Sequence, residues 1–429
     1  MRFFKRHAID IRPLRHAPYR RLFIGQSVSA VGLAFTAVAV PVQMFALSGS
    51  SLWVGLLGLA SLVPLVVFAL WGGALADRAD RRVLLLAASL VMWTSTLLFL
   101  LCTAVGLASP WLLLVLTALQ SMGMGASSAT RGSIIPRLVP ATELPAANSL
   151  NMTAMTISMT AGPLLAGLLV KDGHFGWAYG VDAVLFTVVL WATVRLPSLR
   201  PRTGTESEGV APAVPTERRP GWREIRAGLA FIAATPVLWL SFAIDIAAMV
   251  LALPRALFPE VAEQRYGPGS IGALYAAIAI GSALAGLTSG WISRVRRQGI
   301  ALVVAVVTWG LAVAAAGLAR SLWLALLLLA VGGAADLVSA VYRQTILQSY
   351  APDELQGRMQ GVFFAVVAGG PRLGDLRAGA TAALLGSTVS WVGGGLAAAV
   401  VASLLAIAFP ALVRYPGPAR AVEPAHPNR

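Results

Sequence analysis

The sequence predicts an all-α membrane protein whose twelve spanning helices form two related halves, and three observations lead to this fold class. The 429 residues are 57% hydrophobic and only 12% charged, which is too little charge to cover a soluble domain of this size. The apolar residues gather in runs of about 20, the length that crosses a bilayer as helix. Sequence features of the first set of runs recur in the second.

The apolar runs can be placed from one end of the chain to the other. Pro, Gly and charged residues separate them, as expected of short loops between helices. The twelve expected spans cover 22–46, 53–76, 83–106, 111–133, 146–170, 177–195, 236–258, 270–293, 299–318, 321–345, 358–384 and 388–412.

A stretch of different composition separates the sixth span from the seventh. Residues 200–221 are rich in Pro, Thr, Glu and Arg and have no apolar periodicity, which is typical of a linker. Residues 222–233 are expected to form a short amphipathic helix on the membrane surface. The predicted organisation is a basic tail, a six-helix half, a linker, a second six-helix half and a tail: 1–21, 22–195, 196–235, 236–413 and 414–429.

Two matches between the halves indicate a duplicated unit. At an offset of 217 positions, Val54–Gly55 matches Ile271–Gly272 and Gly73 matches Gly290. At an offset of 212 positions, Arg131–Ile134 matches Arg343–Ile346. Parallel repeats of this kind place a binding site near mid-membrane, between the halves.

The distribution of Lys and Arg predicts that both termini are cytoplasmic. Residues 1–21 hold seven, residues 195–226 hold seven, and the hairpins after the second and eighth spans hold three each, whereas the connections on the other side hold three in all. Basic residues in short loops mark the cytoplasmic side. The expected location is therefore the cytoplasmic membrane. The net charge of +15 is spread over these loops and does not indicate a nucleic-acid partner.

Several function classes are disfavoured. Cys102 is the sole cysteine, no His, Cys or carboxylate cluster has the spacing of a metal site, and no phosphate-binding Gly-rich loop with its Lys is present. We therefore expect no cofactor, no metal and no enzyme activity, since a membrane enzyme would need clustered catalytic groups. A sensor without transport would need a large soluble domain. The expected partners are lipid, a small molecule and protons, and we expect a monomer.

The stretch between the second and third spans carries a family resemblance. Gly73-Ala-Leu-Ala-Asp77-Arg78-Ala-Asp80-Arg81-Arg82 resembles the signature hairpin of the major facilitator superfamily, in which Gly usually stands where this chain has Asp80. In the fifth span, the motif Gly162-Pro163-Leu-Leu-Ala-Gly167 resembles the antiporter motif of exporters in that superfamily. The Arg that many proton antiporters carry in the fourth span is absent.

Further stretches narrow the resemblance to one branch, which contains enterobactin (siderophore) exporters and macrolide efflux pumps. They include Val40–Gln43 in the first span and Ile271–Ala277 in the eighth. The resemblance implies the major facilitator fold and a secondary exporter that works by alternating access. It implies proton-coupled export of a bulky metabolite such as a siderophore, with a multidrug or macrolide efflux pump as the alternative.

The residue types of the same hairpin, between the second and third spans, also suggest a physical role. Gly73 allows helices to approach closely, and Asp77 at the membrane edge can dock on a helix N-terminus or on an arginine of the other half. We expect Gly73, Asp77 and Arg78 to form a cytoplasmic gate, and Arg81 and Arg82 to follow the positive-inside distribution. Arg131 and Arg343 occupy equivalent places in the two halves and are expected to join the gate, with Glu143, Glu354 or Asp77 as partners.

Charged residues within spans are costly and therefore informative. Asp245 has no cation within a helical turn in sequence and ranks first as a proton or substrate site, with an interhelical salt bridge as the open alternative. Asp336 ranks second. Asp375 lies near Arg372 and is expected to pair with it, and Arg255 lies toward the outer end of the seventh span.

Uncharged side chains add candidates for a substrate path. Gln26 and Gln43 lie in the first span and Asn151 in the fifth, although each could instead bridge helices. Met152, Met155 and Met159 follow Asn151, and methionine suits an adaptable cavity for a bulky, partly apolar substrate. Asp182, in the sixth span, is expected to accept hydrogen bonds as part of the structure.

Overall fold

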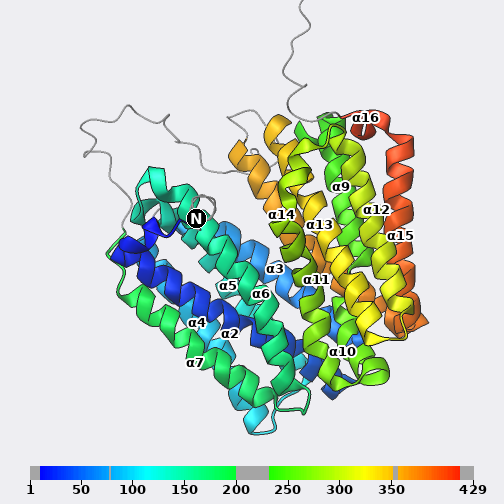
Figure 1. Ribbon diagram of the computed structural model, residues 1–429. Coiled ribbons are helices and arrows are strands. Elements are labelled where there is room, and N and C mark those ends of the chain that lie inside the picture. Colours follow the sequence, from blue (N-terminus) through cyan, green and yellow to red (C-terminus); the bar gives the residue numbers. More distant parts are fainter. Residues whose placement is uncertain (1–9, 77–78, 200–230, 351–355, 416–429) are drawn as a thin grey trace, which may run out of the picture. The chain divides into compact units, whose positions relative to one another are not determined.

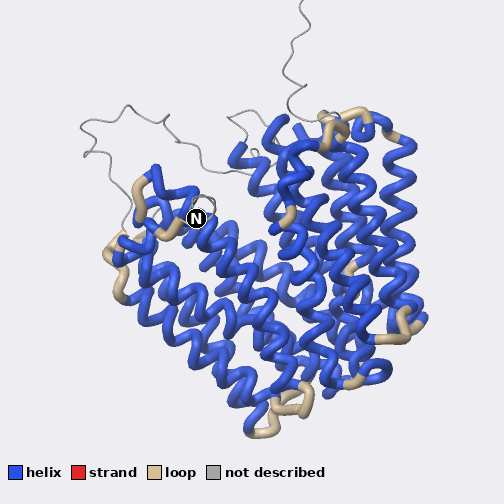
Figure 2. The backbone as a smooth tube through the Cα atoms, viewed as in Figure 1, coloured by secondary structure: helices blue, strands red, loops and turns tan. Residues whose placement is uncertain are grey.

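The computed structural model describes residues 10–76, 79–199, 231–350 and 356–415. In these ranges helices are the only regular secondary structure, joined by loops, and no strand is present (Figures 1 and 2), which confirms the all-α class. The expected linker, nearly all of the expected amphipathic helix, and Asp77 and Arg78 lie outside the described residues.

The first six long helices coincide with the first six expected spans. They are α2 (Ala17–Ser48), α3 (Ser51–Ala76), α4 (Arg81–Ala104), α5 (Pro110–Leu138), α6 (Leu144–Val170) and α7 (Phe175–Val194). Short 3₁₀ turns precede α2 and α6, at η1 (Arg12–Arg15) and η2 (Ala141–Glu143). Pro41, Pro64 and Pro163 lie inside α2, α3 and α6, and the helices continue through them.

The later part of the chain has six further long helices. They are α9 (Pro236–Ala252), α11 (Ile271–Leu287), α12 (Gln298–Leu318), α13 (Leu322–Tyr350), α14 (Gln356–Leu385) and α15 (Ser387–Ala408). Shorter elements connect them: η3 (Arg255–Leu257), α10 (Phe258–Val261), the π-helical η4 (Ala262–Tyr266), η5 (Pro268–Ser270), η6 (Ser289–Arg294) and α16 (Pro410–Val413).

Eleven segments within the described residues are long and apolar enough to cross a membrane. They include α2 to α7, α11, α12, α13 and α15, and the segment Pro236–Tyr266 that begins with α9. Helix α14 is 30 residues long and coincides with the expected eleventh span, but it carries several charged residues, among them Arg372, Asp375 and Arg377. The chain is therefore a multi-pass membrane protein.

The expected seventh span, 236–258, is not one continuous helix. Helix α9 ends at Ala252, Leu253 is extended with φ −70° and ψ 118°, and Pro254 follows. Proline lacks an N–H and disfavours helical geometry in the residue before it, so the helix stops there. Helix α15 likewise ends at Ala408, ahead of Phe409 and Pro410. The expected eighth span also changes character, because α11 ends at Leu287 and a 3₁₀ segment, η6, follows.

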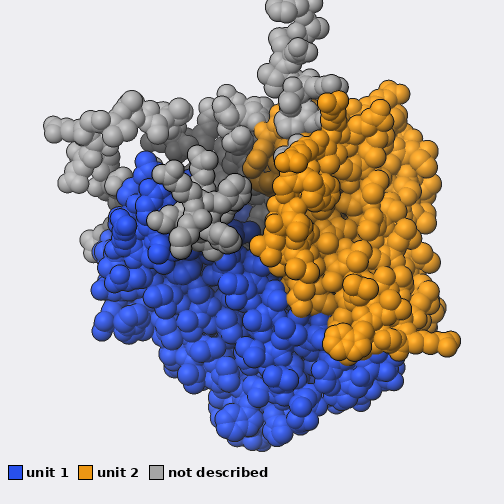
Figure 3. Space-filling model, in the orientation of Figure 1, with its two compact units in different colours: residues 1–208, 262–276 blue, residues 209–261, 277–429 orange. Residues whose placement is uncertain are grey.

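The chain forms two compact units (Figure 3). The first comprises residues 1–208 together with 262–276, and the second comprises 209–261 and 277–429. In the first unit α2 packs on α6 and α7, and α5 packs on α3 and α4. In the second unit α12 lies between α13 and α15. The units are described separately below.

Glycine makes one helix crossing in the second unit unusually close. A Cβ atom on Gly310 of α12 would lie 2.6 Å from the carbonyl oxygen of Gly395 in α15, and a Cβ on Gly395 would lie 2.5 Å from the Gly310 carbonyl oxygen. Only a residue without a side chain fits at either position. Small residues of this kind let membrane helices pack backbone to backbone.

Candidate functional site

Asp245 and Arg343 form a buried ion pair in the second unit. Asp245 lies on α9 and Arg343 on α13, and the pair joins Arg343 Nη1 to Asp245 Oδ1. The two side chains are 3% and 7% exposed. An interhelical salt bridge was one of the two alternatives that the sequence left open for Asp245, and it is present in this structure.

Arg343 also lies near a second acid. Its Nη2 is 3.9 Å from Oδ1 of Asp336, which lies seven residues earlier on α13 and so on the same helix face. The Asp336 side chain is 31% exposed, far more than that of Asp245. One guanidinium therefore has two carboxylates within reach, one in contact and one at the limit of an ion pair. Of the acids expected as partners of Arg343 from the sequence, Asp77 and Glu354 lie outside the described residues, and Glu143 contacts His16.

A second group of charges surrounds Asp375 on α14. The backbone N–H of Ala256 in η3 donates a hydrogen bond to the Asp375 carboxylate, and both Arg255 and Arg372 act on it electrostatically. Arg372 itself donates from Nη1 to the carbonyl oxygen of Ala368, at 2.6 Å. Asp375 thus connects α14 to the segment that follows the break in α9, and Arg372 is not its sole cation.

Arg377 has a role that the sequence did not suggest. Its guanidinium donates to the carbonyl oxygens of Val250 (3.1 Å from Nε), Leu251 and Ser390 (3.0 Å from Nη1). The first two carbonyls belong to the last turn of α9, where helical partners run out because of Pro254. Arg377 therefore caps the broken helix. The break at Pro254 is the signal that could have predicted a donor here.

Asp80 is the described residue of the hairpin with the most contacts. It caps α4 by accepting from the N–H of Arg82 (2.9 Å), and it also accepts from Ser198 Oγ (2.5 Å) and the N–H of Leu199 (3.0 Å). Arg82 donates to the carbonyl oxygen of Val194, at the end of α7. These contacts tie the start of α4 to the segment after α7. An Asp immediately before a helix is a capping signal, and it could have identified this residue.

The other expected gate residues are only partly described. Gly73 lies in the last turn of α3, Arg81 is the first residue of α4, and Arg131 lies in α5. Glu143, one of the acids suggested as a gate partner, lies 3.1 Å from Nε2 of His16 in the first unit.

The exporter motif of α6 lies in two tight helix contacts within the first unit. A Cβ atom on Gly162 would collide with the side chain of Ala34 in α2. A Cβ on Gly167 would lie 2.6 Å from the backbone nitrogen and Cα of Gly272. A Cβ on Gly272 would in turn lie 2.5 Å from the carbonyl oxygen of Pro163. Two stretches that carried the resemblance therefore contact one another.

The polar candidates of the first unit make contacts inside the helix bundle. Gln43 is 3% exposed, donates to Thr103 Oγ1 (3.0 Å) and accepts from the Tyr179 hydroxyl (2.7 Å). Asn151 hydrogen-bonds the hydroxyl of Tyr19. Gln26 Nε2 is buried and has no hydrogen-bond partner among the described residues. Gln43 and Asn151 thus bridge helices, which is the alternative that the sequence left open.

Asp182 is the enclosed carboxylate of the first unit. It is 0% exposed, and its Oδ2 accepts from Thr36 Oγ1 (2.5 Å) on α2 and from Thr96 Oγ1 (3.2 Å) on α4. Gln120 Nε2 lies 3.4 Å from the same Thr96 hydroxyl and extends the network to α5. Asp182 is therefore the hydrogen-bond acceptor that the sequence predicted.

A comparison with protein family models identifies the family of this chain. A family model described as transmembrane secretion effector matches residues 9–420 of the chain. The chain belongs to the transmembrane secretion effector family. The family model covers both units and all the charges described above, and it agrees with the exporter resemblance of the hairpin and of α6.

Curated relatives of this family member match over nearly the whole chain. The enterobactin exporter EntS of Shigella boydii serotype 18 is 28% identical over 404 residues, which cover 93% of this chain and 94% of that protein. The enterobactin exporter EntS of Escherichia coli O81 matches with the same identity and coverage.

Solved structures show the same fold at low identity. The nucleoside transporter NupG superposes with a TM-score of 0.71 at 15% identity, over 93% of this chain and 100% of that one. A bacterial homologue of the human lysosomal transporter Spinster, in an inward-facing and unoccupied conformation, gives a TM-score of 0.68 at 17% identity, over 94% and 97% of the two chains. The chain therefore has the major facilitator fold. Its match to the transmembrane secretion effector family supports a membrane transporter of exporter type.

Proposed function

We propose that this protein is a proton-coupled secondary exporter, which moves a siderophore-like metabolite out of the cytoplasm by alternating access. The observation that carries the proton coupling is the pair of carboxylates around Arg343. In the proposed orientation both termini face the cytoplasm, and the functional unit is a monomer.

Arg343 is suited to change partner when a proton binds. Removing one member of a buried ion pair leaves an uncompensated charge, at a cost of about 3–5 kcal/mol. A proton on Asp245 removes the partner of Arg343 in that way, and Asp336 is the next acid, at 3.9 Å. Protonation of Asp245 would therefore transfer Arg343 from an acid on α9 to an acid on its own helix. The contact between α9 and α13 would then depend on protonation.

The class of substrate is proposed from the relatives and from the surface of α6. Enterobactin is the cargo named for the relatives. On α6 the side chains of Met152, Met155 and Met159 are 66%, 54% and 47% exposed. Methionine is flexible and polarisable, so such a surface suits a bulky and partly apolar molecule.

A multidrug or macrolide pump is the second candidate, and the same methionines favour it. An adaptable apolar surface accepts many shapes, and promiscuous binders use such methionine-rich surfaces. The two candidates differ in one expectation: a siderophore exporter is required for the release of one metabolite that the host cell makes, whereas a drug pump is not.

Deleting the gene in its native host separates these candidates. Under iron-poor growth we expect the deletion strain to release much less iron chelator into the medium and to accumulate it in the cell, and the wild-type gene should restore release. Unchanged chelator in the medium, with new sensitivity to macrolides, would favour the drug pump over the siderophore exporter.

A further inference from the structure

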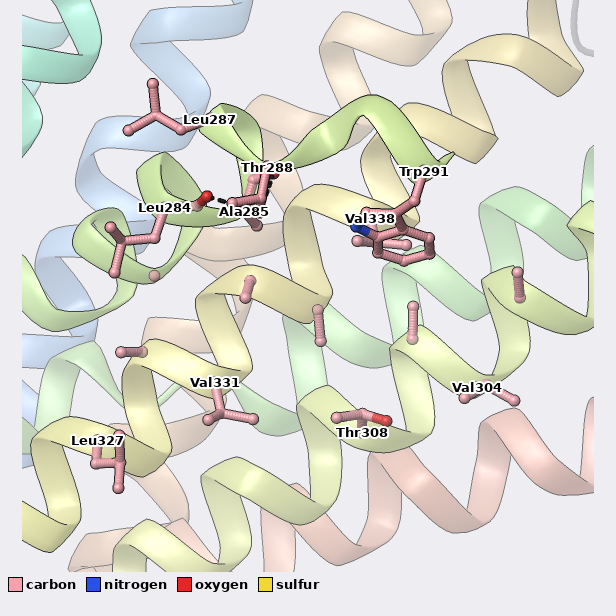
Figure 4. A pocket seen from close by; sticks show the side chains of 16 residues that line it. Leu284, Ala285, Leu287, Thr288, Trp291, Val304, Thr308, Leu327, Val331 and Val338 are labelled. Atoms are coloured by element: carbon pink, nitrogen blue, oxygen red, sulfur yellow. Dashed lines mark hydrogen bonds between the residues drawn. The ribbon is translucent and has the colours of Figure 1, made fainter. Parts of the chain in front are cut away.

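Each unit has an apolar groove formed by three of its helices. The larger groove, in the second unit, has a volume of about 780 Å³ and is lined by α11, α12, α13 and the start of η6 (Figure 4). The smaller groove, in the first unit, has a volume of about 440 Å³ and is lined by α3, α4 and α5. Because α3 and α4 both pack along α5 and hardly touch each other, α5 forms the floor of the smaller groove.

The two grooves are equivalent by the internal duplication. The α4 residues that line the smaller groove and the α12 residues that line the larger one lie 217 positions apart, from Leu84 and Ala301 to Val91 and Thr308. The α5 and α13 residues lie 212 positions apart, and Met122 corresponds to Ala334. These are the offsets that relate the two halves in sequence, so both halves have kept the same concave feature.

The chemistry of the larger groove suits a hydrocarbon chain. Its walls carry exposed apolar side chains, with Leu284 58% and Leu327 61% exposed. Thr288 and Thr308 are its only hydroxyl groups, and Thr288 already donates to the carbonyl oxygen of Leu284 at 3.0 Å. A polar substrate would find few partners among these lining residues.

The length of the larger groove matches one leaflet of a bilayer. On α13 the lining residues run from Leu327 to Val338, a difference of eleven positions in the chain. At about 1.5 Å per residue this is about 16 Å, close to half of the hydrocarbon thickness of about 30 Å. The groove thus accommodates the acyl chain of a lipid from a single leaflet.

Positive charge at one end of the larger groove favours a lipid with an anionic headgroup. Trp291 lines that end, and the exposed Arg294, Arg296 and Arg297 follow it in the chain. Basic clusters beside spanning helices attract anionic lipids, and Trp is enriched at the level of the headgroups. We propose that the larger groove binds one anionic phospholipid, with an acyl chain along α13 and the headgroup at Arg294–Arg297.

The smaller groove provides an internal comparison. Arg82, near its end, is half-buried and donates to the carbonyl oxygen of Val194, and Arg81 is also half-buried. The smaller groove is lined by Met122 where the larger groove is lined by the smaller residue Ala334. The smaller groove therefore has less volume, and its Arg82 is already engaged by a backbone carbonyl group.

Native mass spectrometry of the full-length protein in mild detergent tests the headgroup assignment. Phosphatidylglycerol and phosphatidylcholine with identical acyl chains are titrated in turn. We expect the wild type to bind one phosphatidylglycerol more tightly than phosphatidylcholine. With about a fivefold contribution from each arginine, R294Q/R296Q/R297Q should bind phosphatidylglycerol on the order of a hundredfold more weakly and phosphatidylcholine unchanged. Equal binding of the two lipids by the wild type would overturn the proposal.

Two exchanges between the repeats locate the lipid. Ala334→Met fills the larger groove with the residue of the smaller one, and Ala87→Val gives the smaller groove the residue that corresponds to Val304. We expect Ala334→Met to weaken phosphatidylglycerol binding at least tenfold and Ala87→Val to leave it unchanged. Phosphatidylglycerol binding that withstands Ala334→Met, or that falls with Ala87→Val, would contradict the larger groove as the site. Equal thermal unfolding midpoints for both variants show that folding is intact.

Discussion

At the scale of single residues, enclosed polar groups distinguish the two units. In the first unit the carboxylate of Asp182 accepts hydrogen bonds from the hydroxyls of Thr36 and Thr96. In the second unit Asp245 has Arg343. The first arrangement holds three helices together through hydrogen bonds, whereas the second offers a charge whose partner can change. This difference supports the proposed proton role of Asp245 and a structural role for Asp182.

Replacing Asp182 tests that division. Asp182→Ala leaves the buried hydroxyl of Thr36 without its acceptor, at a cost of about 1–3 kcal/mol, while the hydroxyl of Thr96 keeps the carbonyl oxygen of Met92 at 3.3 Å. We expect a clearly lower thermal unfolding midpoint in detergent, measured by the fluorescence of the protein. Asp182→Asn keeps an oxygen acceptor at the same place, so its thermal unfolding midpoint should fall much less. Equal midpoints for Asp182→Ala and the wild type would show that the hydrogen bonds contribute little.

Candidate residues could be predicted from the sequence where a single physical rule identifies them. The cost of a buried charge identified Asp245 and Asp336, but the rule does not say which cation approaches from another helix. The cation that pairs with Asp245 is Arg343 on α13, 98 positions later in the chain. Local residue spacing could not have predicted a contact between residues so far apart in sequence. Arg377 was missed because its partners are backbone carbonyl groups of other helices, which only the folded chain brings near. Asp80 was missed although its position directly before a helix is a capping signal in the sequence.

At the scale of elements, glycine and proline decide the helix contacts. In the fifth-span motif, Gly162 and Gly167 contact other segments closely. Pro163 leaves α6 continuous, whereas Pro254 ends α9. Span positions followed from hydropathy, but the break at Pro254 did not, because apolar residues continue beyond it.

Substitutions at two glycines test the packing of α6. In Gly167→Ala the new Cβ would lie 2.6 Å from backbone atoms of Gly272, which cannot move aside easily. Overpacking of this kind costs about 1–3 kcal/mol, so the unfolding midpoint should fall. Gly180→Ala in α7 is the matched control, because nothing lies within 4 Å of its new Cβ. A Gly167→Ala protein as stable as Gly180→Ala would contradict the close contact.

At the scale of the whole molecule, the duplication is the feature that joins sequence, fold and function. Two offsets in the sequence predicted two six-helix halves, and the same offsets relate the two lateral grooves. The halves have diverged in charge, however. Within the described residues the ion pair and the acid pair around Arg343 belong to the second unit, while the equivalent Arg131 of the first unit lies on α5. This asymmetry assigns the proposed proton step to one unit.

Proton-driven transport in everted membrane vesicles tests the central claim most directly. Vesicles with an acidic lumen, made from cells that contain the full-length protein, are given labelled enterobactin outside. For the wild type we predict accumulation that disappears when the proton gradient is collapsed. Asp245→Asn should abolish this dependence on the gradient, while Asp182→Asn, a buried carboxylate without an assigned proton role, should retain it. Accumulation by Asp245→Asn with the same dependence on the gradient as the wild type would contradict the account.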